Sequence, residues 1–157
     1  MDKKGMTIVE LLLSIILISI VLMLIIQLCL RARNTYLNSS INVQYELSKS
    51  IIIDAVMSDL IKKDISSINR DGNSILFNYE DGTIKTLSIS PSDDVYLIKY
   101  SGGDDPVIAR EYKQGEVEYN GINEYSINYG DNALKEYRIM LNGTDGYDYT
   151  INLYCPY

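Results

Sequence analysis

The stretch of sequence that decides the fold runs from residue 11 to residue 30 and reads LLLSIILISIVLMLIIQLCL. It carries no charge, and only Ser14, Ser19 and Gln27 within it are notably polar. A helix of this length is about 30 Å long, which is the thickness of the hydrocarbon core of a bilayer. The pattern therefore predicts a membrane-spanning helix over residues 11–30.

A cleaved secretory signal is the competing interpretation of this stretch. The apolar part of such a signal is only about 7 to 15 residues long and ends in small residues. Here the stretch ends in Leu28, Cys29 and Leu30 and is followed by Arg31. Lipid attachment at Cys29 is disfavoured as well, because the residue before it is not small. We therefore expect Cys29 to be an ordinary apolar residue of the span.

Basic residues flank the span on both sides, so charge alone does not orient it. Lys3 and Lys4 precede the span, and Arg31 and Arg33 follow it. Glu10 directly adjoins the apolar residues, and an acidic group carried to the bilayer centre costs about 2.5 to 3.5 kcal/mol. This position favours a functional role for Glu10, although a carboxylate that simply stays in water is the alternative.

Residues 3–10 read KKGMTIVE, and the apolar stretch follows them directly. Together, these residues and the stretch resemble the class III signal of type IV pilins and pseudopilins. The common form of that signal is a basic leader followed by Gly, Phe, Thr, Leu, a variable residue and Glu. Gly5, Thr7 and Glu10 match this form, and Met6 stands where the family usually has Phe. The resemblance covers roughly residues 1–30.

The resemblance implies how the amino-terminal end is processed and used. A membrane prepilin peptidase would cut between Gly5 and Met6 and methylate the new amino group of Met6. Glu10 would serve filament assembly by pairing with the amino terminus of Met6 in a neighbouring subunit, since opposite charges attract strongly at low dielectric. The leader, residues 1–5, would be cytoplasmic, so the carboxyl-terminal part of this cell-membrane protein would lie outside.

The apolar stretch continues into a long segment that favours helix. Residues 7–70 contain no Gly and no Pro, so one helix is expected over residues 6–70. Its part after the span, residues 31–70, is amphipathic, and it is expected to end near Ser66 to Asp71. One stripe at helical spacing should pack against a globular domain and contains Leu37, Ile41, Tyr45, Ser48, Ile52 and Val56. A second apolar face contains Ile53, Met57 and Ile61.

From Gly72 the apolar residues alternate and turn residues recur, so a β-rich domain is expected over residues 72–157. Two hairpins are expected, one over residues 75–79 and 84–89 and one over residues 95–100 and 107–112. Further strands are expected at residues 116–119, 124–129, 137–141 and 147–153. The sequence thus predicts an α+β fold in which a long amino-terminal helix packs on a mainly antiparallel β-sheet, and the resemblance implies the same pilin-like fold.

The composition argues against several kinds of function. The chain has 14 Lys and Arg against 21 Asp and Glu, a net charge of -7, so direct binding of nucleic acid is not expected. It contains no His, and a Ser or Cys nucleophile without His would need a Lys base or another unusual partner. We expect no catalytic residues, no metal site and no cofactor. A calcium site at the acidic turns around residues 93–94, 104–105 and 142–148 is disfavoured, because none has EF-hand spacing and solvated turn residues explain them.

Tyrosine and cysteine are the remaining conspicuous residues. The chain has 14 Tyr against one Phe, and Tyr pairs share a strand face at positions 96 and 100, 125 and 129, and 147 and 149. A platform for sugars or bases is one interpretation, but rings packed on neighbouring strands with wet hydroxyls are favoured. Cys155 is the one Cys after the span, so no disulfide is expected within the β-rich domain.

These observations predict a structural filament subunit, either a minor pilin or a pseudopilin, rather than an enzyme. The filament would belong to a type IV pilus, a type II secretion system or a competence system, and residues 107–110 resemble the larger minor pseudopilins. The implied partners are prepilin peptidase, other pilin or pseudopilin subunits, the assembly platform with its motor ATPase, and the membrane. The rivals are an uncleaved single-pass anchor that displays a binding or adhesion domain, and a surface hydrolase.

Overall fold

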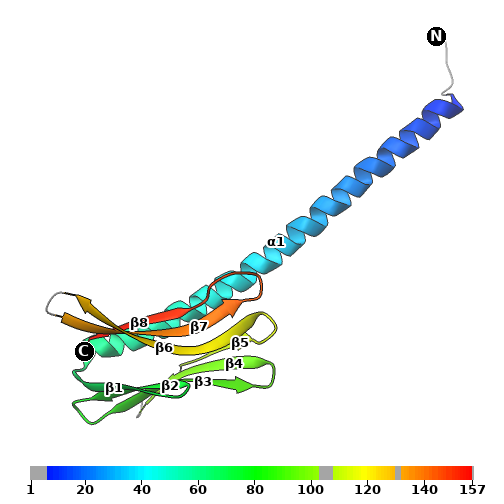
Figure 1. Cartoon of the computed structure of the whole chain (residues 1–157). Coiled ribbons are helices and arrows are strands. Elements are labelled where there is room, and N and C mark those ends of the chain that lie inside the picture. The colour runs from blue at the N-terminus through cyan, green and yellow to red at the C-terminus, as the bar shows by residue number, and fades with distance from the viewer. Residues whose placement is uncertain (1–6, 103–107, 130–131, 157) are drawn as a thin grey trace. The chain divides into compact units, whose positions relative to one another are not determined.

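A computed structural model describes residues 7–102, 108–129 and 132–156 of the chain. The chain divides into two compact units, Met1–Asn42 and Val43–Tyr157. The helix α1, Ile8–Lys62, is 55 residues long and contributes to both units. The absence of Gly and Pro from this segment explains why the helix is uninterrupted. The expected long amino-terminal helix is therefore confirmed (Figure 1).

The helix ends earlier than the sequence suggests. It stops at Lys62 instead of near Ser66 to Asp71, and the next segment is the strand β1, Ile65–Asp71. This segment forms an antiparallel pair with β2, Ser74–Tyr79, through a tight turn in which Gly72 has φ +55°. Residues 65–71 contain no helix breaker, but pairing with β2 and burial of Ile68 favour a strand there. These tertiary interactions outweigh the local preference for helix.

The remaining strands complete two antiparallel sheets. The five-stranded sheet has the order β1-β2-β3-β4-β5, with β3 at Ile84–Ser92, β4 at Val95–Ser101 and β5 at Ile108–Lys113. The three-stranded sheet has the order β6-β7-β8, with β6 at Val117–Tyr129, β7 at Asn132–Gly143 and β8 at Ile151–Pro156. The α+β class and both expected hairpins, β2 with β3 and β4 with β5, are confirmed, although Val107 lies outside the described residues.

Two expected strand boundaries are wrong. Residues 116–119 and 124–129 are not separate strands, because β6 runs through them with an irregularity between Tyr119 and Ile122. Gly121 has φ +96° at this point, so the strand absorbs an extra residue instead of ending. The last strand begins at Ile151 rather than at Tyr147, because the residues before Ile151 form a turn and a single bridge with β7.

One face of the later part of α1 forms the core of the second unit together with both sheets. Tyr45, Ser48, Ile52 and Val56 are buried, as the helical stripe predicts. The ring of Tyr45 stacks on Tyr112 of β5 at 4.9 Å and meets Tyr149, which precedes β8, edge to face at 5.2 Å. Within Val43–Tyr157 the helix therefore contacts the five-stranded sheet and the segment that leads into β8. The earlier stripe residue Leu37 belongs to the other unit and is 46% exposed.

Candidate functional site

The expected processing and assembly site lies at the amino-terminal end of α1. Gly5 and Met6 lie outside the described residues. Glu10 lies in the first turn of α1 and is exposed. The geometry around Glu10 is therefore the part of this site that the structure describes.

Thr7 and Glu10 cap the helix reciprocally. The backbone N–H of Thr7 and its hydroxyl both donate to Glu10 Oε2 at 2.9 Å. In return the backbone N–H of Glu10 donates to Thr7 Oγ1 at 3.3 Å. This is a capping box, in which the side chains three residues apart satisfy N–H groups that have no partner inside the helix.

The capping box itself does not neutralise the charge of Glu10. Both donors from Thr7 are neutral, so the carboxylate keeps its negative charge, which the positive end of the helix dipole favours. A carboxylate has two oxygens and several lone pairs, so it can accept a further hydrogen bond from a cation while it caps the helix. Chemically, this end of α1 is suited to receive an ammonium group.

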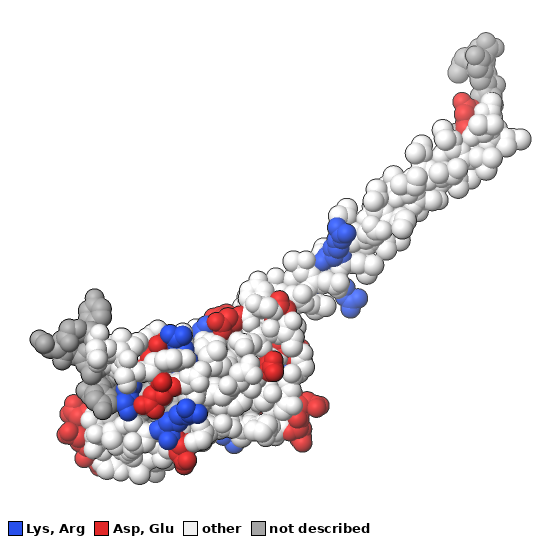
Figure 2. All heavy atoms as spheres, viewed as in Figure 1, with Lys and Arg blue, Asp and Glu red and all other residues white. Residues whose placement is uncertain are grey.

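The segment that follows Glu10 presents an apolar surface on all sides. The hydroxyls of Ser14 and Ser19 each donate to the backbone carbonyl four residues earlier at 2.8 Å, so they do not interrupt that surface. Figure 2 shows the white, uncharged length of this helix between an acidic and a basic position. The helix is long and apolar enough to cross a membrane, and none of its most apolar stretch is buried by the described residues.

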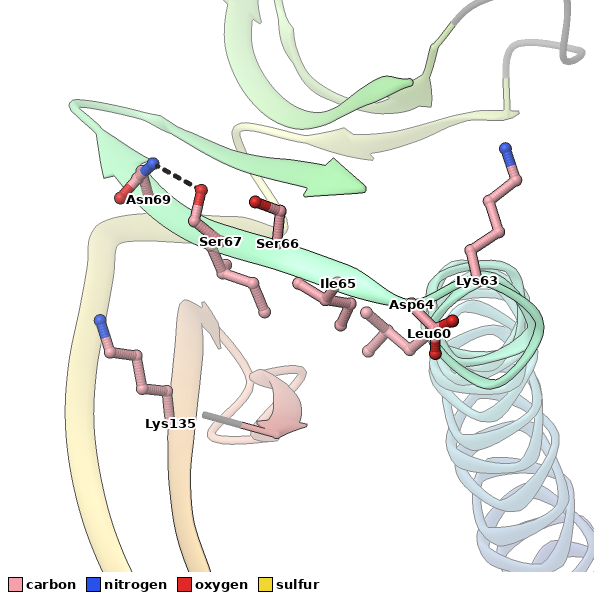
Figure 3. Close-up of a pocket in the computed structure, with 9 residues that line it drawn as sticks. Leu60, Lys63, Asp64, Ile65, Ser66, Ser67, Asn69 and Lys135 are labelled. Carbon is pink, nitrogen blue, oxygen red and sulfur yellow. Dashed lines mark hydrogen bonds between the residues drawn. The ribbon is translucent and has the colours of Figure 1, made fainter. Parts of the chain in front are cut away.

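A cavity among the described residues lies in the second unit, beside β1. It has a volume of about 530 Å³ and is lined by Leu60, Lys63, Asp64, Ile65, Ser66, Ser67, Ile68, Asn69 and Lys135. Figure 3 shows Lys135 reaching it from β7, across from Leu60 and Ile65. Both lysines already pair with carboxylates, Lys63 with Asp81 at 3.1 Å and Lys135 with Glu124 at 2.9 Å. The cavity therefore offers no uncompensated cation to a ligand.

The acidic turns hold their own backbone in place. Asp145 Oδ1 accepts the N–H of Tyr147 at 3.1 Å, and Asp148 Oδ1 accepts the N–H of Thr150 at 2.8 Å. The contact with Thr150 holds the pKa of Asp148 below its usual value. No group of three potential metal ligands occurs among residues 7–102, 108–129 and 132–156. Residues 104 and 105 lie outside these ranges.

The tyrosines divide into a buried and an exposed group. Tyr100 and Tyr149 are buried, as the packing interpretation predicts, whereas Tyr125 is 43% and Tyr147 59% exposed. Tyr147 and Tyr149 stack at 6.4 Å, but they precede β8 and do not lie in a strand. The side chain of Tyr129 lies outside the described residues.

A polar cluster on the three-stranded sheet was not predicted. Glu136 and Arg138 of β7 form a two-point ion pair, with Nε to Oε1 at 2.8 Å and Nη2 to Oε2 at 3.0 Å. The Arg138 guanidinium lies 4.8 Å from the ring centroid of Tyr125, and Tyr154 of β8 lies opposite Glu136 in the strand register. The spacing of Glu136 and Arg138 by two residues in a strand is the sequence signal for this pair, but the cross-strand register needs the structure.

The cysteines are both free, and Cys155 is buried. Burial raises the pKa of the Cys155 thiol to about 12. No protein-family model, curated protein or solved structure matches the chain. The fold and the geometry of the described residues therefore carry the functional argument together with the sequence.

Proposed function

We propose that this protein is a structural subunit of a membrane-anchored filament of the type IV pilin class, a minor pilin or pseudopilin. The observation that carries the proposal is a single helix with two different surfaces. The helix exposes apolar side chains on all sides over residues 11–30, and it buries one stripe in the core of Val43–Tyr157. Such a helix suits a subunit that is stored in a membrane and then packs against other helices.

The amino-terminal residues support the same proposal. Gly5, Thr7 and Glu10 match the prepilin signal, and Glu10 adjoins the apolar stretch with a carboxylate that its neutral Thr7 donors do not neutralise. Prepilin peptidase would cut between Gly5 and Met6 and methylate Met6. The amino group of Met6 would then pair with Glu10 of a neighbouring subunit. The sheet domain would lie outside the cell membrane, and an assembly platform with its motor ATPase would extract the subunit.

Mass spectrometry of the amino terminus tests the processing step. Protein isolated from its native membrane should begin at an N-methylated Met6. Gly5→Ala should slow cleavage only mildly, whereas Gly5→Leu should block it, because a large side chain keeps the backbone away from the peptidase. Native protein that begins at Met1 would overturn the proposal and favour an uncleaved membrane anchor.

A pair of substitutions at Glu10 separates its two roles. Glu10→Gln keeps a side chain that completes a capping box but removes the charge, whereas Glu10→Ala removes both. If charge pairing drives assembly, both variants should be cleaved normally and should enter filaments poorly, to a similar extent. Normal incorporation of Glu10→Gln together with loss of Glu10→Ala would show that helix capping, not charge, is required. Incorporation is measured by immunoblotting sheared filament fractions.

A further inference from the structure

The outer face of the three-stranded sheet carries an ordered array of side chains. The register places Tyr125, Glu136 and Tyr154 in one row across β6, β7 and β8, and Asn123, Arg138 and Asn152 in the next row. The neighbouring residues Tyr137, Ile122 and Leu153 are buried on the opposite face of the sheet. We call these six side chains the Tyr–Arg array.

The centre of the array is fixed before any ligand arrives. Glu136 is only 2% exposed although it lies on the outer face, because its neighbours cover it. Two N–H groups of Arg138 donate to its carboxylate, and they hold its pKa below the usual value. The ring of Tyr125 supports the other side of the guanidinium. Groups that are already ordered lose little entropy when they bind a ligand.

The accessible groups of the array have a mixed apolar and polar character. Tyr154 is 48% exposed and the Arg138 side chain 44%, and the register makes them diagonal neighbours on β8 and β7. The site therefore offers a flat aromatic ring and a flat guanidinium that keeps N–H groups not used by Glu136. Asn152 is exposed next to them and offers both a donor and an acceptor. A pyranose ring has a matching character, because its C–H face stacks on aromatic rings and its hydroxyls exchange hydrogen bonds with amides and guanidinium groups.

The charge of the array indicates which ligands fit. Glu136 neutralises Arg138 and already occupies the two-point fork that would recognise a phosphate or a carboxylate. An anionic polymer therefore gains little here. A stable protein interface covers about 800 Å² on each partner around an apolar core. The array does not resemble such an interface, because it consists of only six side chains and has an ion pair at its centre instead of an apolar core. One of the six side chains, Glu136, is buried.

We propose that the Tyr–Arg array is a binding site for a neutral glycan, with a pyranose ring stacked on Tyr154 and hydrogen-bonded to Arg138 and Asn152. Tyr125 and Glu136 act as positioning residues that hold the guanidinium in place. The proposal does not rest on filament assembly, since it requires only the fold of Val43–Tyr157. It gives the exposed sheet domain a task of its own, which is attachment to a polysaccharide.

Binding is tested with the full chain in lipid nanodiscs, prepared without glycoside detergents because these carry the same sugar groups. The probes are immobilised hexasaccharides of β-1,4-linked glucose, N-acetylglucosamine and mannose, with oligogalacturonate and heparin fragments as anionic controls. We expect at least one neutral hexasaccharide to bind and the anionic controls not to bind. Absence of neutral binding, or binding of the anionic controls alone, would overturn the proposal.

Variants locate the site on the bound hexasaccharide. Tyr154→Ala and Arg138→Lys should each weaken the affinity by about tenfold or more. Tyr154→Phe keeps the ring and should stay within about threefold of the natural chain. Tyr147→Ala is the matched control, because this tyrosine is also exposed but lies outside the array, and it should bind normally.

The variants also give clear contrary outcomes. Equal weakening by Tyr147→Ala and Tyr154→Ala would place the glycan elsewhere, and circular dichroism of each variant shows whether it is folded. Photo-crosslinking from position 154 in cells, with the sibling subunits as the main product and no glycan binding in the nanodisc assay, would assign the array to a protein contact and overturn the glycan site.

Discussion

Individual side chains explain why the polar residues beside the apolar span are tolerated. Glu10 accepts two hydrogen bonds from Thr7, and the hydroxyls of Ser14 and Ser19 bond to carbonyls of their own helix. None of these arrangements needs a second molecule. The capping box therefore organises the helix end in the unassembled chain, and it leaves the charge of Glu10 available for a partner.

Replacing Thr7 tests the capping box. Thr7→Ala removes the hydroxyl that donates to Glu10 and accepts from its N–H, so the first turn should lose about 1 kcal/mol of stability. Thr7→Ser keeps the hydroxyl and serves as the control. Hydrogen exchange of the first-turn amides, measured in nanodiscs, should be faster in Thr7→Ala alone. Equal exchange in both variants would argue that the capping box contributes nothing there.

The Tyr45 hydroxyl joins the helix to the end of β5 and to the turn that follows it. The hydroxyl donates to Glu116 Oε2 at 2.6 Å and accepts the backbone N–H of Lys113 at 3.2 Å. Tyr45→Phe should lower the free energy of unfolding by about 1 to 3 kcal/mol, because it removes two part-buried hydrogen bonds, one of them to a charged carboxylate. Tyr112→Phe should have a smaller effect, since the Tyr112 hydroxyl makes a longer contact of 3.4 Å. Denaturant titration followed by circular dichroism measures both, and the reverse order would contradict this account.

Alkaline pH provides an independent test of the same residue. Burial, helped by the hydrogen bond to Glu116, raises the pKa of Tyr45 to about 12, from 10.0 for an exposed tyrosine. The folded chain therefore keeps this proton while the unfolded chain loses it. The stabilisation is complete below about pH 10 and is lost as the pH rises towards 12. Tyr45→Phe should show a shallower loss of stability between pH 10 and 12 than the natural chain, and an unchanged slope would contradict the assignment.

At the scale of elements, a buried ion pair ties α1 to the five-stranded sheet. Asp59 Oδ2 of α1 lies 2.8 Å from Lys85 Nζ of β3 and accepts the Tyr100 hydroxyl at 2.7 Å. The Lys85 side chain is 4% exposed and that of Asp59 19%. Desolvation opposes such a pair, so its main effect is to fix how the helix lies on the sheet within Val43–Tyr157.

Replacing only one partner of the Asp59–Lys85 pair should lower the stability of the fold more than replacing both partners. Asp59→Ala leaves a buried ammonium without this carboxylate and should destabilise the fold by about 3 kcal/mol. The double variant Asp59→Ala with Lys85→Met should recover part of the loss. Lys113→Met removes an exposed pair with Glu116 and should change stability by less than about 1 kcal/mol. A double variant less stable than Asp59→Ala would show that Lys85 acts mainly through other contacts.

The irregularity in β6 gives a second prediction at this scale. Gly121 has φ +96°, so Gly121→Ala should destabilise the sheet by about 1 to 2 kcal/mol although nothing obstructs the new methyl group. Gly115→Ala is the control, because Gly115 also has open space but no positive φ. Thermal unfolding of both variants measures the difference. Equal midpoints would indicate that the strand can rearrange around the added methyl group.

Periodicity predicted the elements better than their ends. The long helix, its buried stripe from Tyr45 to Val56 and both hairpins follow from local patterns. The end of α1 at Lys62 and the strand β1 do not, because residues 65–71 become a strand only through pairing with β2. The Tyr–Arg array was missed for a similar reason, since it joins residues of three strands whose register no local pattern reveals.

At the scale of the whole chain, charge and hydrophobicity are strongly segregated. Residues 11–30 carry no charge, whereas the chain after residue 30 has 12 basic and 19 acidic residues and so accounts for the full net charge of -7. The two compact units divide at Asn42, and the buried residues of α1 all lie after that point. The first unit thus depends on an apolar environment, while the second holds its own core.

This division predicts that the second unit folds without the first. A chain comprising Val43–Tyr157 keeps every buried residue of α1 and both sheets, so it should be soluble, rich in β-structure and cooperative in thermal unfolding. The full chain should instead float with liposomes in a density gradient, because an apolar helix of about 20 residues partitions into bilayers. Ile52→Asp is the control for the core and should unfold the isolated domain, since Ile52 is fully buried. Aggregation of Val43–Tyr157 under conditions in which the full chain is folded in liposomes would show instead that the sheets depend on the apolar first part of α1.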